Sequence, residues 1–223
     1  MFFEGQSQLV ERDVVETSVF RDRKLSADIR FDNQLKTLAY SPDGRFIAAS
    51  YNSRPSSGSG FAIWSGSTGR RLLDLKNNYQ DLHLRPETGT RSGAMAFSSD
   101  SRYLASVIVL QESIDQAHLI CVWDASSGEV QVVMHGGHKA EITDVEFTRN
   151  GQRIATSSLD GTVRIWDVKT GLEVLTLDEH TGGVEGLGFS PDGWRLASAN
   201  HDGTIRVWDA RPVEGEPEPA THR

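Results

Sequence analysis

The sequence of 223 residues contains a single cysteine, Cys121, and no long apolar stretch. One cysteine excludes an intramolecular disulfide framework and a cysteine-rich zinc site. No apolar run approaches the roughly 18 residues that a membrane-spanning helix needs, so we expect no membrane association. The first residues also lack a basic segment followed by an apolar core, and we therefore expect no secretory signal and a cytoplasmic protein.

An excess of positive charge is also missing. The chain has 23 Lys and Arg against 31 Asp and Glu, for a formal net charge of −8. A protein that holds nucleic acid through its phosphates needs a basic face, so we predict no nucleic-acid partner. His135 and His138 lie close together, but no third ligand follows in the sequence near them. We therefore predict no metal site and no cofactor.

What the sequence does contain is an internal repeat. Residues 40–44, 97–100, 147–151 and 189–193 share an aromatic residue followed by a polar turn. A short strand of small residues and then a tryptophan follow each segment. Trp166 and Trp208 are 42 residues apart, and Trp123 and Trp166 are 43 apart, whereas Trp64 precedes Trp123 by 59. A period of about 40 residues is typical of propeller blades.

The third unit shows the strands of one blade most clearly. Residues 142–147 alternate between apolar and polar side chains, as in a half-buried strand. Asn150-Gly151, Asp160-Gly161 and Thr170-Gly171 are turn pairs that separate the strands of a hairpin. The unit therefore predicts four short antiparallel strands.

Two pentapeptides carry a family resemblance. Residues 163–167 read Val-Arg-Ile-Trp-Asp, and residues 205–209 read Ile-Arg-Val-Trp-Asp. Both resemble the signature strand of the WD-repeat (WD40) family. The resemblance covers about residues 35–210, closely in the third and fourth units and loosely in the first two. It implies an all-β fold, a WD40-type β-propeller with four recognisable four-stranded blades in an incomplete or oligomer-completed ring.

The predicted organisation has three parts. The last unit stops after its third strand, and residues 23–31 stand in the register of a fourth strand. Three arrangements stay open: a small closed ring, an eight-bladed ring made by a homodimer, and part of a longer propeller. We expect an N-terminal strand segment (1–34), four blades (35–75, 91–133, 138–177 and 180–210, together 35–210) and a disordered acidic tail (211–223).

The resemblance also implies a structural chain of four hydrogen-bonded side chains in each regular blade. A Ser-His-Asp set could be a catalytic triad, but a triad forms a single site. A duplicated set that ends on tryptophan favours buried polar groups that satisfy one another. We therefore predict no catalytic residues. The first two units lack the full set, and we expect apolar packing alone to hold them. The predicted tetrads are His138, Thr156, Asp160 and Trp166, and His180, Ser198, Asp202 and Trp208.

Three insertions in the first two units, at 51–60, 76–90 and 110–117, should lie on one rim of the propeller. A binding role for this rim and ordinary loop drift stay open as alternatives. We predict a non-catalytic interaction scaffold that presents top-face loops to a protein or peptide partner. The alternative is a regulatory or sensory module of a larger enzyme. The positions similar to the family's partner-contact sites are Gln34, Lys36, Arg91, Glu141, Thr143, Leu159, Glu185 and His201.

Overall fold

A computed structural model describes residues 34–52, 59–75, 92–110 and 117–211 of the chain. These residues fold into strands and turns, and no helix among them is long and apolar enough to cross a membrane. The strands are β1 (Gln34–Tyr40), β2 (Phe46–Asn52), β3 (Ser59–Ser65), β4 (Arg71–Asp74), β5 (Ser92–Phe97), β6 (Tyr103–Leu110), β7 (Ala117–Asp124), β8 (Val130–Met134), β9 (Ile142–Phe147), β10 (Arg153–Ser158), β11 (Val163–Asp167), β12 (Glu173–Leu177), β13 (Val184–Phe189), β14 (Arg195–Asn200) and β15 (Ile205–Asp209).

Consecutive strands pair antiparallel into four sheets, which we call blades 1 to 4. Blades 1, 2 and 3 contain β1–β4, β5–β8 and β9–β12, and each has four strands. Blade 4 contains β13, β14 and β15. The predicted all-β propeller is therefore confirmed, although blade 4 has three strands within the described residues. Residues 23–31, which were predicted to supply the fourth strand, lie outside those residues.

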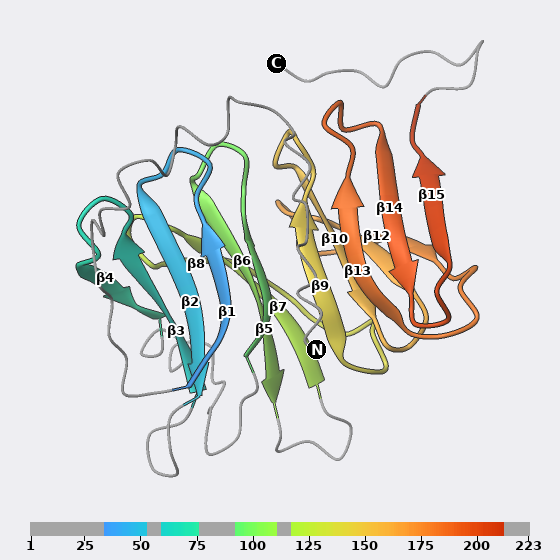
Figure 1. The fold of residues 1–223 in the computed structure, drawn as a ribbon, viewed down its shortest axis with the longest axis horizontal. Helices are drawn as coiled ribbons and strands as arrows, with labels where there is room; N and C mark the ends of the chain where they lie inside the picture. Colours follow the sequence, from blue (N-terminus) through green and yellow to red (C-terminus); the bar gives the residue numbers. More distant parts are fainter. Residues whose placement is uncertain (1–33, 53–58, 76–91, 111–116, 212–223) are drawn as a thin grey trace, which may run out of the picture.

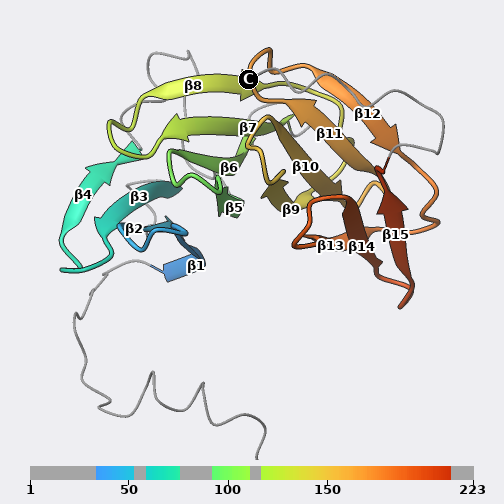
Figure 2. The same ribbon diagram turned by 90° about the horizontal axis from the view of Figure 1, so that it is seen from above.

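The four blades form an open arc (Figure 2). The first strands β1, β5, β9 and β13 lie along the inner side of this arc, and β4, β8 and β12 lie along its outer side. Neighbouring inner strands contact one another in chain order. Blade 1 and blade 4 lie at the two ends of the arc (Figures 1 and 2).

The turn between the first two strands of a blade requires a left-handed backbone. Gly44, Gly151 and Gly193 adopt it with φ of 74°, 67° and 80°, where glycine has no Cβ penalty. Blade 2 has Ser101 at this position, with φ of 62°. Its hydroxyl accepts a hydrogen bond of 3.0 Å from the Asp43 N–H of blade 1. This contact between blades offsets the cost of about 1 kcal/mol for a left-handed serine.

The hydrophobic core lies between the blades. Because strand side chains alternate, each blade has two apolar faces. Ile63 and Trp123 meet in the cluster between blades 1 and 2. Val122 and Trp166 meet between blades 2 and 3, and a third cluster lies between blades 3 and 4. A fourth cluster, around Trp64, lies within blade 1 alone.

Candidate functional site

Blade 3 contains a continuous chain of buried polar side chains. His138 Nε2 lies 2.8 Å from Thr156 Oγ1, and His138 Nδ1 lies 3.0 Å from Asp160 Oδ2. Trp166 Nε1–H donates to the same Thr156 oxygen at 2.9 Å. Thr156 is fully buried, so its hydroxyl cannot reach a substrate. The geometry is that of a structural network that joins the entry loop of the blade to β10, to β11 and to the turn between them.

Asp160 fixes the loop end of this chain. Its carboxylate also accepts hydrogen bonds from the Lys139 N–H at 2.8 Å, the Thr162 N–H at 2.9 Å and the Thr162 hydroxyl at 2.7 Å. Burial disfavours the charged carboxylate, but the hydrogen bonds from His138 and Thr162 and from the two N–H groups outweigh it. They hold the pKa of Asp160 well below its usual range. The Asp160 carboxylate is therefore ionised and fully engaged.

Blade 4 uses a different partner for its histidine. His180 Nε2 lies 2.6 Å from Ser198 Oγ, and Trp208 Nε1–H donates to Ser198 Oγ at 2.9 Å. The other ring nitrogen, His180 Nδ1, lies 3.1 Å from the side-chain amide of Asn200. The predicted place of Asp202 next to the His180 ring is thus corrected, because the Asn200 side chain occupies it.

The residue at the end of the second strand explains the difference. Blade 3 has Ser158 at this point, and its short side chain bonds the Ala140 carbonyl at 3.1 Å. The longer Asn200 reaches both His180 and the Gly182 carbonyl. Since the Asn200 N–H donates, His180 Nδ1 must accept, and we infer that the ring is neutral with its hydrogen on Nε2. Burial and the charge of Arg206 lower the pKa of His180, in agreement with a neutral ring.

Asp202 instead forms its hydrogen bonds with residues of the surface loops. Its carboxylate accepts hydrogen bonds from the Thr204 N–H at 2.9 Å, the Thr204 hydroxyl at 2.7 Å and the Thr181 hydroxyl at 3.4 Å. Asp202 is exposed. It therefore orders the surface loop, whereas Asp160 anchors a buried chain.

Blade 2 retains half of the network. Trp123 Nε1–H donates to Ser106 Oγ at 2.8 Å, and both residues are fully buried. The prediction that apolar packing alone holds this blade is therefore wrong. In blade 1, Ala49 takes the hydroxyl position, and Trp64 packs against it in an apolar cluster. Phe31 and Thr88, at the histidine positions of these blades, lie outside the described residues.

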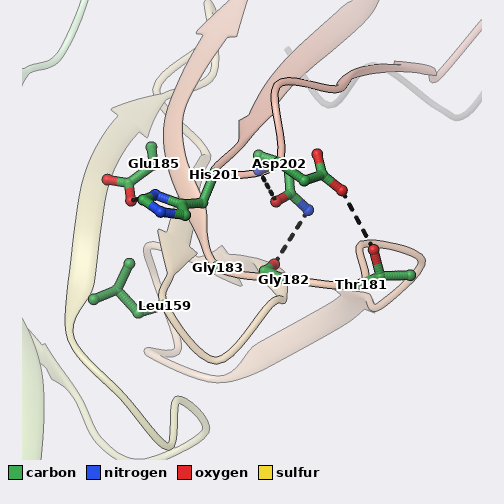
Figure 3. Close-up of a pocket in the computed structure, with 8 residues that line it drawn as sticks. Leu159, Thr181, Gly182, Gly183, Glu185, His201 and Asp202 are labelled. Atoms are coloured by element: carbon green, nitrogen blue, oxygen red, sulfur yellow. Dashed lines mark hydrogen bonds and ion pairs between the residues drawn. The ribbon is translucent and has the colours of Figure 1, made fainter.

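Three predicted partner-contact residues come together at one end of blades 3 and 4. Leu159 of blade 3 and Glu185 and His201 of blade 4 line an open hollow of about 420 Å³ (Figure 3). His201 Nδ1 lies 3.1 Å from Glu185 Oε1, and both side chains are exposed. We call this the top-face hollow, after the top-face loops that the sequence predicts as contact sites. Its lining residues are Leu159, Thr181, Gly182, Gly183, Glu185, Asn200, His201 and Asp202.

The other predicted contact residues lie elsewhere. Glu141 is exposed beside the hollow, where its carbonyl accepts from the Leu159 N–H at 2.9 Å. The Thr143 hydroxyl bonds Ser157 Oγ at 2.8 Å and the Val184 carbonyl at 2.7 Å. Thr143 therefore joins blade 3 to blade 4.

At the far end of the arc, Gln34 begins β1 and Lys36 is exposed on the same strand, away from the hollow. Arg91 lies outside the described residues. The insertion at 76–90 also lies outside them, and so does most of the insertions at 51–60 and 110–117, but the ends of these two lengthen the strands. Strands β2 and β3 have seven residues and β6 and β7 have eight, against six and five in β10 and β11.

Sequence reasoning missed two carboxylates that connect blades 3 and 4. Asp144 Oδ2 accepts from the Leu187 N–H at 2.9 Å, and Glu146 Oε2 accepts from the Phe189 N–H at 3.0 Å. Burial raises the pKa of both carboxyl groups. These acids satisfy the N–H groups on the inner edge of β13. The available signal was a pair of charges at alternate positions of β9, where β5 carries two alanines.

Among the described residues, His138 and Cys121 have structural positions. Within the described ranges, no group of three His, Cys, Asp or Glu side chains could hold a metal ion. Both ring nitrogens of His138 are engaged in the network, and His135 is exposed. Burial raises the pKa of Cys121 to about 12, so its thiol is a core group.

Comparison with known proteins identifies the repeats. Residues 129–167 and 171–209 match the family model described as WD domain, G-beta repeat. WD repeat-containing protein 18 of Bos taurus is 27% identical over 173 residues, which cover 77% of this chain and 37% of that protein. Subunit I of eukaryotic translation initiation factor 3 of Aspergillus niger is 39% identical over 59 residues, 26% of this chain and 17% of that protein. The chain thus spans well under half the length of both relatives.

The structural comparison agrees with the repeat assignment. The solved structure of the RRP9 WD40 repeats has a TM-score of 0.64 and 26% identity, and the match covers 81% of this chain and 49% of that one. Residues 129–167 and 171–209 are therefore WD40 repeats, and the four sheets have the fold of blades in a WD40-type β-propeller. This confirms the resemblance seen in the two pentapeptides. WD40 propellers are a general type of protein-interaction scaffold.

Proposed function

We propose that this chain is a non-catalytic scaffold that binds a protein or peptide partner through the top-face hollow. The observation that carries the proposal is the convergence of Leu159, Glu185 and His201 from two blades on one open hollow. An exposed apolar side chain beside a polar pair suits recognition of another chain, since interfaces combine an apolar centre with a polar rim. The partner specificity is then set by loops, while the blades are the frame.

The frame beneath the hollow supports this proposal because it is rigid. The His138 chain fixes the loop that carries Leu159, since Asp160 directly follows Leu159. The Asn200 contacts with His180 and Gly182 fix the two loops of blade 4 relative to each other. A binding surface held in one geometry loses less conformational entropy when the partner binds.

The absence of catalysis is part of the same proposal. The best candidate for a nucleophile, Thr156, is buried in the network. The two matched relatives are named as a WD repeat protein and a translation factor subunit.

Because the net charge is −8, we also propose that the protein works without nucleic acid. A cytoplasmic location is part of the same proposal. Microscopy of a tagged chain tests the location.

Substitution of Leu159 by aspartate is expected to reduce partner binding by roughly tenfold or more, as for a central interface residue. The measurement is quantitative affinity capture with the wild-type chain and the variant, followed by a binding titration with the recovered protein. Leu172→Asp is the matched control. Leu172 is also exposed, but it follows the turn at the opposite end of β11.

The expected pattern is a partner that is lost with Leu159→Asp and with His201→Ala but retained with Leu172→Asp. A partner that all three variants recover equally would exclude the hollow as the binding site. Circular dichroism of each variant checks that the fold is intact.

A further inference from the structure

Each internal blade buries two faces. We call the face toward the next blade the forward face and the face toward the preceding blade the rear face. The forward faces of the internal blades carry apolar or small side chains, and the rear face of the next blade covers them. The forward face of blade 2 includes Ala105, Val107, Ile120 and Val122, and that of blade 3 includes Ala155, Ser157, Val163 and Ile165, all of them buried.

Blade 4 has the same forward face, and no other blade of the described residues covers it. In blade 3, Ala155 pairs with Ile165 across the two strands. In the same register of blade 4, Ala197 pairs with Val207 and Ala199 with Ile205. Ile205 and Val207 are 71% and 63% exposed. The residues that would form a junction are thus present, and their largest side chains face solvent.

The inner strand of this face, β13, has glycines in place of larger side chains. Gly188 and Gly186 of β13 lie beside Ala197 and Ala199. A methyl group at Gly188 would meet no atom within 4 Å. Large side chains from an incoming blade therefore have room over β13.

The opposite end of the arc carries suitable large side chains. Leu38 and Tyr40 on the rear face of blade 1 are 67% and 53% exposed. Their counterparts in blade 3 are Val145 and Phe147, which are buried in the cluster against blade 2. The chain therefore carries both halves of a further junction, and they lie at opposite ends of the arc (Figure 2).

We propose that these two ends meet between two copies of the chain. The forward face of blade 4 in one copy packs on the rear face of blade 1 in the other, and the reciprocal contact closes an eight-bladed ring. In one copy the two ends lie apart, because the three packed junctions between its blades set the curvature of the open arc (Figure 2). Two copies give eight blades, at the upper end of the usual four to eight, whereas three copies would exceed it.

The junction is heterologous, since two different faces meet, and it occurs twice in a closed pair. The four side chains at its centre, Leu38, Tyr40, Ile205 and Val207, carry no charge. Burying them removes exposed apolar surface from water, while the charged Asp209 lies at the end of the same face of β15.

Sedimentation equilibrium of the full chain over a wide concentration range tests this proposal. The expected mass of the wild-type chain at high concentration is twice 24.6 kDa. Val207→Asp and Leu38→Asp should each give the mass of one chain, because each buries a charge in both junctions. The Leu172→Asp control, on an exposed residue away from both faces, should keep the mass of two chains.

A mixture of the two variants separates this arrangement from any other dimer. Val207→Asp leaves the rear face of blade 1 intact, and Leu38→Asp leaves the forward face of blade 4 intact. The mixture should therefore form a one-to-one complex through a single junction.

A single-chain mass for wild type at every concentration, or a two-chain mass that Val207→Asp leaves unchanged, would overturn the proposal. If circular dichroism shows that Val207→Asp is unfolded, Ile205→Asp replaces it. No outside partner enters these measurements, so their outcome is independent of the proposed function of the top-face hollow.

Discussion

Replacement of Asp160 by alanine is expected to lower the free energy of unfolding by about 3 kcal/mol. The substitution removes the partner of the buried His138 ring and of two backbone N–H groups at once. Because the Asp160 side chain is only 8% exposed, water cannot replace these contacts without opening the blade. Urea unfolding followed by circular dichroism measures the change.

Asp202→Ala is the matched comparison. Asp202 occupies the same position in blade 4, but it is exposed and bonds only loop residues. We expect a clearly smaller destabilisation than for Asp160→Ala. Equal losses for the two variants would contradict the contrast between the two blades.

The Asp160 contribution should also depend on pH. A carboxyl whose folded pKa is below its unfolded value of 3.8 stabilises the fold above that value. The stabilisation is lost as pH falls through the unfolded value toward the folded one. The difference in unfolding free energy between wild type and Asp160→Asn should therefore be constant near neutral pH and shrink below about pH 4. A difference that grows as the pH falls would contradict the assignment.

Trp123→Ala is expected to cost about 3–5 kcal/mol, which is the usual range for a buried tryptophan. Trp123 is fully buried between blades 1 and 2, and it donates to Ser106. The alanine variant leaves a large cavity and an unpaired hydroxyl. Trp194→Ala is the control, since Trp194 is 44% exposed and should change stability by less than about 0.5 kcal/mol.

Urea unfolding of both tryptophan variants provides the test. If Trp123→Ala is no less stable than Trp194→Ala, the packing between blades 1 and 2 differs from that described. Trp123→Phe should fall between wild type and Trp123→Ala, because it retains most of the apolar packing but leaves Ser106 without its donor.

The repeat made the blades predictable from sequence. Turn pairs such as Asn150-Gly151 specify local conformation, and alternation in residues such as 142–147 assigns a face to each side chain. Both signals are local in the chain, so they need no knowledge of distant contacts. The His138 chain came from the family resemblance, and the recurrence of its members at fixed spacing in two units favoured a structural role over a catalytic one.

The exceptions arise from contacts that the repeat does not specify. Asn200 displaces Asp202 from His180 because one side chain is longer than its counterpart Ser158. Asp144 and Glu146 find hydrogen-bond donors only when the inner edge of β13 lies beside them. Sequence position alone cannot show such contacts, because each depends on the distance between two separately formed loops or strands.

The central claim is that the top-face hollow is the binding surface, and hydrogen–deuterium exchange tests it most directly. Exchange rates of the full chain would be measured alone and with the partner recovered by affinity capture. We predict slower exchange in the loops at 159–162, 181–183 and 201–203, where an occupied hollow excludes water and suppresses local opening. Rates in the outer strands β8 and β12 should stay unchanged. Slower exchange confined to β8 and β12, with the three loops unaffected, would contradict the claim.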